Sequence, residues 1–463
     1  MELLRNKSFL KFDRQFPVYN FFFPNPRKNP SDRPISEIFD RANKLAKSRA
    51  LYFHIPFCDT ICNFCPFSRG LYKDRDIIDR YFDALILEIK RKAESFRLYE
   101  VPVRAIFFGG GTPSLLDAKQ IDIIGRTIKD NFDLSVLEEF SFEVEVKSLT
   151  VEKADAMRSI GVSHPRFGLQ TLDPYWRDMF DLTASLDQIY TATDLLKSRF
   201  PYQSFDLLYG MSGHDEDALL ADLQKAVDLG TTNIDIYPID NIVTQITLHK
   251  KLQEQGKQPT SALRKMSMTV LVDRFMRSAG FSPHNGHGYY RTPCDESTLV
   301  SNEYSFVYHE HVYGYADHDL VGFGTNAISS VNGHTIVNTS RKSAYIDAIQ
   351  SGSYECFIST HDGSLDHARP VVLRLPYHGV IEKKLVNWGQ VPSSVLERLK
   401  ELVEERLVVE TSTTYEVSKL GMFWYVNMMY YLMPKEDQKI MNRMVVDHLK
   451  QPGRTFTKIE LVY

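Results

Sequence analysis

Residues 52–67 decide the fold and read Tyr52-Phe53-His54-Ile55-Pro56-Phe57-Cys58-Asp59-Thr60-Ile61-Cys62-Asn63-Phe64-Cys65-Pro66-Phe67. Cys58, Cys62 and Cys65 fall within eight positions in the spacing C-x3-C-x2-C, and the 463-residue chain has five cysteines in all. The preceding segment 51–55 is apolar and rich in aromatic and β-branched residues, so it predicts a strand that leads into a cysteine loop. Three thiolates on one tight loop can hold three irons of a cubane iron–sulfur cluster, because soft sulfur ligands match iron. Pro66 and Phe67 follow in place of a fourth cysteine, which leaves one iron open to an external ligand.

Other roles for these cysteines fit the sequence less well. A disulfide framework is typical of short secreted chains with an even cysteine count, whereas this chain is long, has five cysteines, and is expected to lack a signal peptide. A structural zinc site needs four closed ligands, and no second C-x2-C pair occurs. Three core cysteines at this spacing by chance are the structural alternative. Cys294 and Cys356 stand alone, and each is expected to be a small core residue.

The cysteine motif and the aromatic-His-Ile-Pro-Phe strand before it resemble the radical S-adenosylmethionine (SAM) superfamily. More narrowly, they resemble the branch of the oxygen-independent coproporphyrinogen III dehydrogenases. The resemblance covers about residues 50 to 430. It implies that the open iron of a [4Fe-4S] cluster binds the amino and carboxylate groups of SAM. It also implies that an electron from the cluster cleaves SAM into methionine and a 5′-deoxyadenosyl radical.

Further segments resemble the SAM-contacting motifs of that superfamily. Residues 109–114, Gly-Gly-Gly-Thr-Pro-Ser, follow an apolar strand and resemble a GGTP loop, in which glycines let backbone amides approach a polar ligand. Glu143 matches the first glutamate of an E-A-N-P-like segment, Gln170 the glutamine of a G-V-Q-S-like strand end, and Asp206 the aspartate of a D-L-I-Y-G-like strand. The cofactor contacts implied by the resemblance are Tyr52, Phe67, Gly110, Gly111, Thr112, Glu143, Gln170 and Asp206.

The candidate catalytic residues lie in two segments of the sequence. Tyr209 ends the strand that carries Asp206. His309 and His311 lie in a polar, histidine-rich region that we expect to line the substrate, where either could accept a proton. A metal bound by the histidines between residues 284 and 334 is the weaker hypothesis, since no ligand spacing repeats among them.

Three positions depart from the pattern of the coproporphyrinogen dehydrogenases. Leu182 stands where those enzymes carry an arginine near SAM, and His164 replaces a usual arginine, with Arg166 two positions on. The additional cysteine that those enzymes carry two positions after Cys65 is also missing. Porphyrin propionates would favour a site rich in arginine, whereas the segments expected near the substrate are aromatic and histidine-rich.

Alternating strands and helices predict an α/β fold with a parallel sheet. We expect a full or partial TIM-type barrel of the radical SAM kind, with an N-terminal arm and a C-terminal winged-helix-like domain. The motif residues all follow strands, and catalytic loops of such sheets lie at the C-terminal ends of their strands. The expected divisions are an arm at 1–47, a radical SAM core at 48–250, an accessory, substrate-lining region at 251–365, and the winged-helix-like domain at 366–463.

Composition limits the partners. The net charge is −4, and no run of eighteen apolar residues occurs, so we expect a cytoplasmic protein that does not bind nucleic acid. A broad apolar stripe at 422–433 is expected to be core, with a lipophilic patch that meets a substrate or a membrane surface as the alternative. A flavodoxin or ferredoxin is the expected electron donor.

The substrate does not follow from the motif. The departures above favour a class C radical SAM methyltransferase, which uses two SAM molecules to methylate an sp2 carbon of an aromatic acceptor. The specific hypothesis is the menaquinone ring, suggested by the apolar C-terminal helix. The alternatives are an oxygen-independent coproporphyrinogen III dehydrogenase, an anaerobic haem-degrading enzyme, and a haem chaperone.

Overall fold

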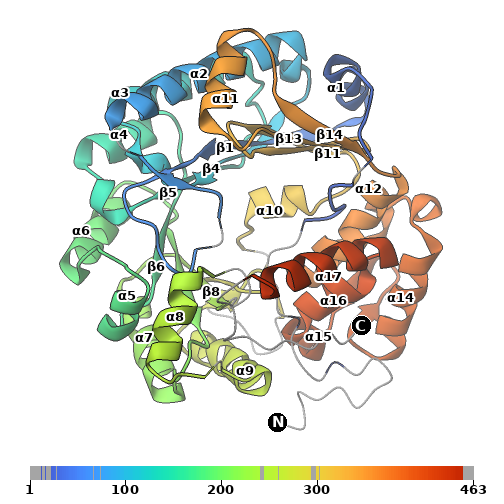
Figure 1. Cartoon of the computed structure of the whole chain (residues 1–463). Helices are drawn as coiled ribbons and strands as arrows, with labels where there is room; N and C mark the ends of the chain where they lie inside the picture. Colours follow the sequence, from blue (N-terminus) through green and yellow to red (C-terminus); the bar gives the residue numbers. More distant parts are fainter. Residues whose placement is uncertain are drawn as a thin grey trace.

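The computed structural model describes residues 12, 16, 22–27, 29–65, 67–72, 74–239, 244–258, 260–292, 299–301 and 303–451. A curved sheet forms the centre of the molecule (Figure 1). Its parallel strands are β11 (His318–Phe323), β1 (Ser48–Ile55), β4 (Val103–Gly110), β5 (Glu139–Val144), β6 (His164–Gln170), β7 (Ser204–Tyr209) and β8 (Asn233–Pro238). Antiparallel strands extend it: β9 (Ser282–Pro283), β10 (Gly288–Tyr290), β12 (Ile328–Val331), β13 (His334–Asn338) and β14 (Cys356–Thr360). Within the described residues this sheet has twelve strands in the order β14-β13-β12-β11-β1-β4-β5-β6-β7-β8-β10-β9.

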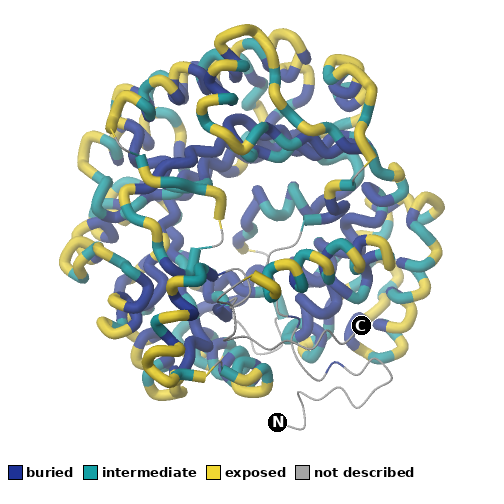
Figure 2. The backbone as a smooth tube through the Cα atoms, viewed as in Figure 1, coloured by how far each residue is buried: buried dark blue, intermediate teal, exposed yellow. Residues whose placement is uncertain are grey.

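The parallel strands are buried on both faces, which explains their nearly continuous apolar sequences. Phe53 on β1 stacks on Phe108 of β4, with ring centroids 4.6 Å apart, and on Phe323 of β11 at 4.9 Å. Figure 2 shows this buried centre inside a more exposed layer of helices. The predicted parallel α/β sheet is therefore present, and its antiparallel ends leave the barrel open.

Helices cover the convex face of the sheet (Figure 1). The helices up to residue 350 are α1 (Ile35–Leu45), α2 (Arg75–Ser95), α3 (Ala118–Asn131), α4 (Val151–Ser159), α5 (Pro174–Met179), α6 (Leu186–Lys197), α7 (Glu216–Asp228), α8 (Ile246–Glu254), α9 (Ala262–Ser278), α10 (Val307–Val312) and α11 (Lys342–Gln350). Their starts follow the capping rule, since Asp117 forms a capping box with Gln120 at α3 and Ser185 forms one with Gln188 at α6.

The short helix α10 lies inside the curve of the sheet, where it contacts β1, β4 and β11 (Figure 1). Glu139 on β5 holds its start, because Oε2 accepts hydrogen bonds from the backbone amides of Val307 at 2.7 Å and Tyr308 at 3.4 Å. A carboxylate at a helix N-terminus interacts favourably with the helix dipole. Glu139 therefore joins the barrel wall to the helix that fills its interior.

The sheet crosses the boundary expected at residue 250. Strands β9 to β14 lie between residues 282 and 360, yet they belong to the same sheet as the core, and β11 pairs directly with β1. The region 251–365 therefore continues the core sheet on both sides.

The C-terminal region packs as a separate layer of helices around a small sheet. Its elements are α12 (Ser364–Arg369), α13 (Leu375–His378), β15 (Val380–Glu382), α14 (Ser393–Glu404), β16 (Val408–Glu410), β17 (Thr414–Val417), α15 (Lys419–Phe423), α16 (Tyr425–Leu432) and α17 (Lys435–Leu449). Trp424, Met428 and Met429 are buried in its core. The apolar stripe is thus core, and the alternative of a lipophilic patch was wrong for these residues. None of the described helices has the length and apolar character of a transmembrane span.

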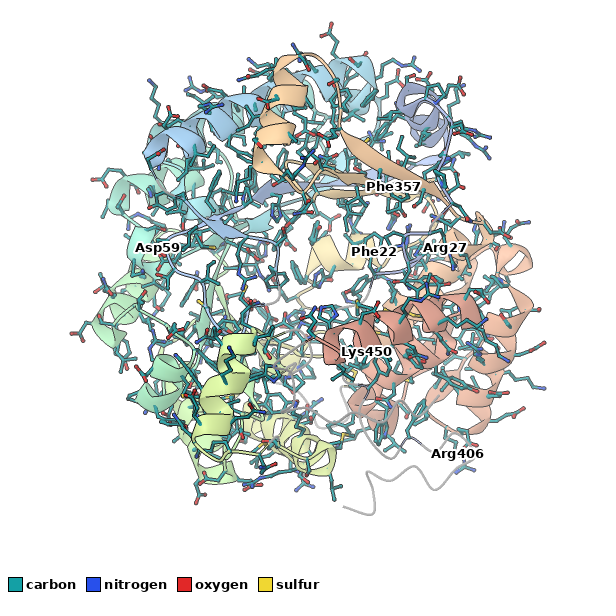
Figure 3. All side chains as sticks on the ribbon, viewed as in Figure 1. Phe22, Arg27, Asp59, Phe357, Arg406 and Lys450 are labelled. Atoms are coloured by element: carbon teal, nitrogen blue, oxygen red, sulfur yellow. The ribbon has the colours of Figure 1, made fainter. Side chains whose placement is uncertain are left out.

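The described part of the N-terminal arm packs on this C-terminal layer. Phe12, Phe16 and Phe23 join its hydrophobic core. Arg27, labelled in Figure 3, forms an ion pair of 2.6 Å with Asp437 on α17. The N-terminal arm and the C-terminal layer are therefore in direct contact.

Candidate active site

A cavity of about 210 Å³ opens at the C-terminal ends of the parallel strands. Ten of the residues selected from the sequence line it: Cys58, Cys62, Cys65, Phe67, Gly110, Gly111, Thr112, Glu143, Gln170 and Asp206. They come from the cysteine loop and from β4, β5, β6 and β7, so one edge of the sheet brings together motifs that span about 150 residues. This is where a parallel α/β sheet places its active site.

Backbone and side-chain contacts fix the cysteine loop. Cys58 ends β2 (Phe57–Cys58), which pairs in parallel with β3 (Gly70–Leu71). Farther along the loop, the backbone amide of Asn63 donates to Phe180 O at 3.2 Å, and Gln245 Nε2 donates to Cys65 O at 2.8 Å. The loop is therefore fixed on one side by the pairing of β2 with β3 and on the other by residues next to α5 and α8.

Burial keeps the three thiols protonated in the protein alone. It raises the pKa of Cys58 and Cys65, and it raises that of Cys62 to about 12, with a further contribution from the two neighbouring thiols. The guanidinium of Arg69 opposes this effect at all three cysteines, and its Nε and Nη2 are buried without a hydrogen-bond partner. A metal centre that binds these sulfur atoms would displace the thiol protons.

The donor set fits an iron–sulfur cluster. Three free thiols from one loop line the cavity, and the orphaned Arg69 donors lie beside them, where anionic sulfur could accept their hydrogen bonds. No group of three or more His, Cys, Asp or Glu among the described residues is arranged for one metal ion.

The glycine loop lies against the cysteine strand. The amide of Gly111 donates to Ile55 O at 2.8 Å. A Cβ at Gly111 would lie 2.5 Å from the carbonyl oxygen of Phe57, so only glycine lets this loop pass so close to β2. On the other side, the hydroxyl of Thr112 lies 3.6 Å from the sulfur of Cys58. The loop and the cysteines therefore form one wall of the cavity.

Two buried carboxyl groups, Glu143 and Asp206, form another part of the cavity wall. Burial, with the nearby carboxylate of Asp206, raises the pKa of Glu143 to about 8. Burial, with the carboxylate of Asp235, raises the pKa of Asp206 to about 7. A cationic ligand would favour their ionised forms. SAM carries a sulfonium and an ammonium group, so this wall matches its charge.

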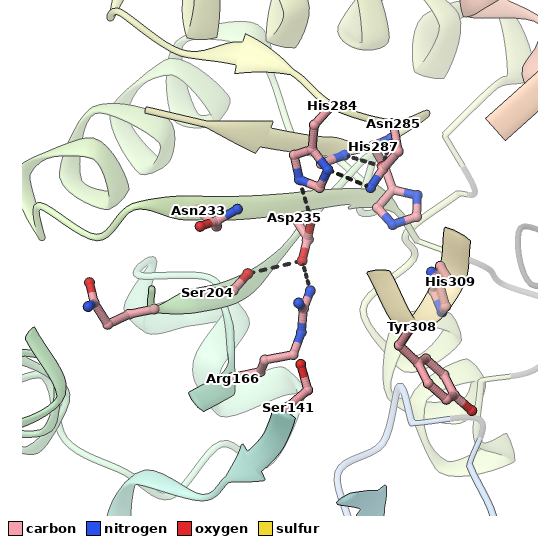
Figure 4. Close-up of polar contacts among 12 residues, drawn as sticks. Ser141, Arg166, Ser204, Asn233, Asp235, His284, Asn285, His287, Tyr308 and His309 are labelled. Atoms are coloured by element: carbon pink, nitrogen blue, oxygen red, sulfur yellow. Dashed lines mark hydrogen bonds and ion pairs between the residues drawn. The ribbon is translucent and has the colours of Figure 1, made fainter. Parts of the chain in front are cut away.

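Arg166, which also lines the cavity, belongs to a network of side chains whose pairing the sequence did not reveal (Figure 4). Arg166, on β6, donates to Oδ2 of Asp235 on β8, and Ser204 on β7 donates to the same oxygen at 3.0 Å. His284 lies 4.0 Å from the other oxygen of Asp235. The partners are as much as 118 positions apart in sequence, so no local motif indicates them.

Four selected residues do not line the cavity. Tyr52 lies on the inner face of β1, where its hydroxyl bonds to Nδ1 of His54 at 2.9 Å. Tyr209 points into the core, with its hydroxyl 2.7 Å from Oγ1 of Thr269 on α9.

The two selected histidines make internal contacts instead. His309 Nδ1 bonds to Tyr377 OH at 3.0 Å. His311 donates from Nε2 to Asp319 O at 2.8 Å and stacks on His318. Burial lowers the pKa of His309 to about 3 and lowers that of His311 as well, so both are neutral. His311 forms its internal bond through Nε2, and its Nδ1 has no partner among the described residues, while Tyr209 uses its hydroxyl. The catalytic roles of these residues stay predictions.

The sequence also missed polar residues of the cavity wall. Arg69, Lys147, Arg166 and Arg177 line it. Lys147 pairs with Asp59 at 2.6 Å, and Arg177 donates to the carbonyl oxygen of Thr171 at 2.9 Å. A basic residue within four positions of Cys65 was the available signal for Arg69. Leu182, noted as a departure, does line the cavity.

Comparison with known proteins agrees with this geometry. Residues 52–226 match the family model described as the radical SAM superfamily. The chain is 26% identical over 391 residues to an anaerobilin synthase of Escherichia coli O157:H7, covering 83% of this chain and 84% of the relative. It is 23% identical over 421 residues to an oxygen-independent coproporphyrinogen III oxidase of Salmonella typhimurium, covering 87% and 91%.

A solved structure shows the fold. Coproporphyrinogen III oxidase (HemN) from Escherichia coli, titled a radical SAM enzyme, superposes with a TM-score of 0.76 at 20% identity, covering 89% of this chain and 96% of that one. The open α/β barrel expected from the sequence is thereby confirmed. The three-cysteine loop, the glycine loop and the cavity residues Glu143, Gln170 and Asp206 all lie within residues 52–226, the segment that matches the radical SAM superfamily model.

Proposed function

We propose that this radical SAM enzyme acts on a tetrapyrrole, and that its substrate is a haem-type macrocycle. The observation that carries the proposal is the cavity, which joins three thiols, the glycine loop and two buried carboxyl groups. Support for the substrate class comes from relatives named for a bilin and for a porphyrinogen, which are an opened and a closed tetrapyrrole. These relatives match 83% and 87% of the chain, well beyond the SAM-binding domain.

Two apolar residues of the cavity favour a haem-type ring over coproporphyrinogen. Leu182 lines the cavity where the resembled dehydrogenases carry arginine, and Phe67 lines it where they carry a further cysteine. Coproporphyrinogen has four propionates, whereas haem has two and carries apolar vinyl groups instead. A more apolar wall suits the more apolar ring.

Methyl transfer to menaquinone remains a prediction with less support. It was suggested by the apolar C-terminal helix, but α16 is buried in its own domain and offers no lipophilic face. The relatives above are not named as methyltransferases. A second SAM and a membrane contact, which belonged to that hypothesis, are not part of the present proposal.

The residues divide into clear roles. Cys58, Cys62 and Cys65 would hold the cluster, which supplies the electron that cleaves SAM. Gly110, Gly111 and Glu143 would bind the amino group of SAM, while Gln170 and Asp206 would bind its ribose. Because the chain holds no other redox group in this proposal, an external flavodoxin or ferredoxin would deliver the electron.

Anaerobic turnover tests the proposal. Reconstituted, dithionite-reduced enzyme is incubated with SAM and either haem, coproporphyrinogen III or menaquinone, and 5′-deoxyadenosine and the products are quantified. We expect haem to stimulate deoxyadenosine formation and to be consumed, and we expect Cys62→Ala to abolish both. Stimulation by menaquinone alone, or haem binding without any SAM cleavage, would contradict the proposal and support methyl transfer or a chaperone, respectively.

A further inference from the structure

Arg166 is a buried cation in the wall of the cavity. Its guanidinium lies 4.0 Å from the ring centre of Phe306, which covers one of its faces. Its Nη2 donates to Asp235 Oδ2 (Figure 4). A guanidinium has five N–H donors in a planar fork, so a bond to one carboxylate oxygen leaves donors for another partner.

Buried carboxyl groups surround this arginine. Although burial raises the pKa of Glu139, Glu143, Asp206 and Asp235, Arg166 lowers the pKa of each of them. Burial lowers the pKa of Arg166 itself, but Asp235 and its other neighbours raise it on balance, so the guanidinium stays charged. It is therefore a fixed positive charge within reach of the cavity.

A second potential hydrogen-bond donor, His284, lies close to Asp235. Oδ1 of Asp235 and Nε2 of His284 are both buried without a partner, 4.0 Å apart. The amide of Asn285 decides which nitrogen of His284 carries the proton. Asn285 Oδ1 accepts from the backbone amides of His287 at 3.0 Å and Gly288 at 2.7 Å, so its Nδ2 must donate to His284 Nδ1 at 3.1 Å.

Neutral His284 therefore carries its proton on Nε2, which faces Asp235. The pKa of His284 is lowered to about 3 by burial, so the ring stays neutral. Gly288 makes this approach possible, because a Cβ there would lie 2.5 Å from His284 Nε2 and 2.6 Å from Asp235 Oδ1. A shift of about 1 Å would turn the 4.0 Å gap into a hydrogen bond of ordinary length.

We propose that Arg166 binds a carboxylate of the ligand in the cavity, and that Asp235 is its exchangeable partner until the ligand arrives. When the ligand carboxylate accepts the hydrogen bonds of the guanidinium, Asp235 keeps the hydrogen bond from Ser204 and gains one from His284. The ligand carboxylate has two sources with the same chemistry, the methionyl end of SAM and a propionate of the tetrapyrrole. Only the second source rests on the proposed function.

The positions of the other cations support this role. Leu182 removes the arginine that the resembled dehydrogenases carry near SAM. The unpartnered donors of Arg69 lie beside the thiols, where cluster sulfur could accept them. Arg177 is occupied by backbone carbonyl groups and Lys147 by Asp59. Arg166, in contrast, is held by one side-chain carboxylate that can be exchanged for another. Arginine suits this task because its fork matches a carboxylate with two parallel hydrogen bonds.

Paired ligands with and without carboxylates test the proposal on the reconstituted holoenzyme. SAM and decarboxylated SAM are titrated by calorimetry, and protoporphyrin IX and its dimethyl ester by fluorescence. In Arg166→Gln we expect a loss of about 10- to 100-fold in affinity for one of the two acids. The matching carboxylate-free ligand should bind wild type and variant alike. Arg166→Lys keeps the charge and should lose less, because lysine lacks the fork.

The outcomes separate the sources. A loss confined to SAM assigns the methionyl carboxylate, and a loss confined to protoporphyrin IX assigns the propionate. Failure of wild type to bind protoporphyrin IX would count against the proposed function, and the SAM pair would then decide the role of Arg166. Equal affinities of wild type and Arg166→Gln for both acids, with cluster content unchanged, would overturn it.

A second variant tests the exchange. Asp235→Asn keeps the shape and the bond from Ser204 but removes the charge that competes with the ligand. We expect it to bind the affected acid more tightly than wild type. Weaker binding by a variant with full cluster content would show that Asp235 only positions Arg166, and the exchange would be wrong.

Discussion

Glu143 and Asp206 are protonated in part at neutral pH, since their pKa values are raised to about 8 and about 7. A cationic ligand stabilises the ionised forms and so lowers both values. We therefore expect SAM binding to release protons, and its affinity to rise with pH between about 6 and 8 and to level off above the pKa of Glu143.

Calorimetry in buffers of different ionisation enthalpy measures this proton release. Glu143→Gln should release fewer protons and flatten the pH dependence, because it removes the group with the higher pKa. Glu397→Gln, at an exposed position on α14, serves as the control and should behave as wild type. A binding enthalpy that does not change with the buffer between pH 6 and 8 would contradict the prediction.

Site residues could be predicted from the sequence when they belonged to one short motif, and not when their partners lay far away along the chain. The cysteines, Gly110 and Glu143 belong to short motifs, so their meeting in one cavity could be foreseen. Arg166 and Asp235 lie 69 positions apart, and their pairing depends on the register of β6, β7 and β8. Tyr209 follows a motif aspartate, yet side chains alternate along a strand, and its neighbours place it on the outer face.

Among the elements, the glycine loop after β4 has the tightest contact with the cysteine strand. We expect Gly111→Ala to push this loop away from β2, because the new Cβ would lie 2.5 Å from the carbonyl oxygen of Phe57. The free energy of unfolding should fall by about 1–3 kcal/mol. The cluster should also be lost more readily, since β2 carries Cys58.

Iron content after desalting and denaturant unfolding measure the two effects. Gly363→Ala is the matched control, because a Cβ there meets nothing within 4 Å and its φ of −60° suits alanine. The variant at 363 should change stability by less than about 0.5 kcal/mol. Normal iron content and stability in Gly111→Ala would show that the loop can move without disturbing the cysteines.

Elements with strong periodicity were predicted well, and short ones were not. The sequence predicts a helix at 395–406 followed by a small hairpin, and the structure has α14 (Ser393–Glu404) and the hairpin. It also predicts a single helix at 419–433, where the structure has two, α15 and α16, which meet at the buried Trp424. The helix breaks where the ring of Trp424 is buried, and the residues that bury it are not evident from the local sequence. Similarly, α10 depends on Glu139, which lies 168 residues before it.

For the whole molecule, the contact between the N-terminal arm and the C-terminal domain is the feature that sequence patterns could not supply. Asp437 on α17 is buried and accepts three hydrogen bonds from the arm. Asn25 donates to it from its backbone amide at 3.1 Å and from its side chain at 3.2 Å, and Arg27 donates at 2.6 Å. These partners lie more than 400 positions apart, so their pairing is visible only in the folded chain.

We expect Asp437→Asn to loosen the arm, because the largely buried guanidinium of Arg27 loses the carboxylate with which it forms an ion pair. The free energy of unfolding should fall by about 1–3 kcal/mol. Trypsin should cut after Arg27 sooner than in wild type, which gel electrophoresis of timed digests measures. Asp447→Asn is the matched control, because Asp447 lies at an exposed position on the same helix and a change there should alter stability by less than about 0.5 kcal/mol. Equal rates of cleavage in the two variants would mean that the aromatic contacts of Phe12, Phe16 and Phe23 hold the arm without Asp437.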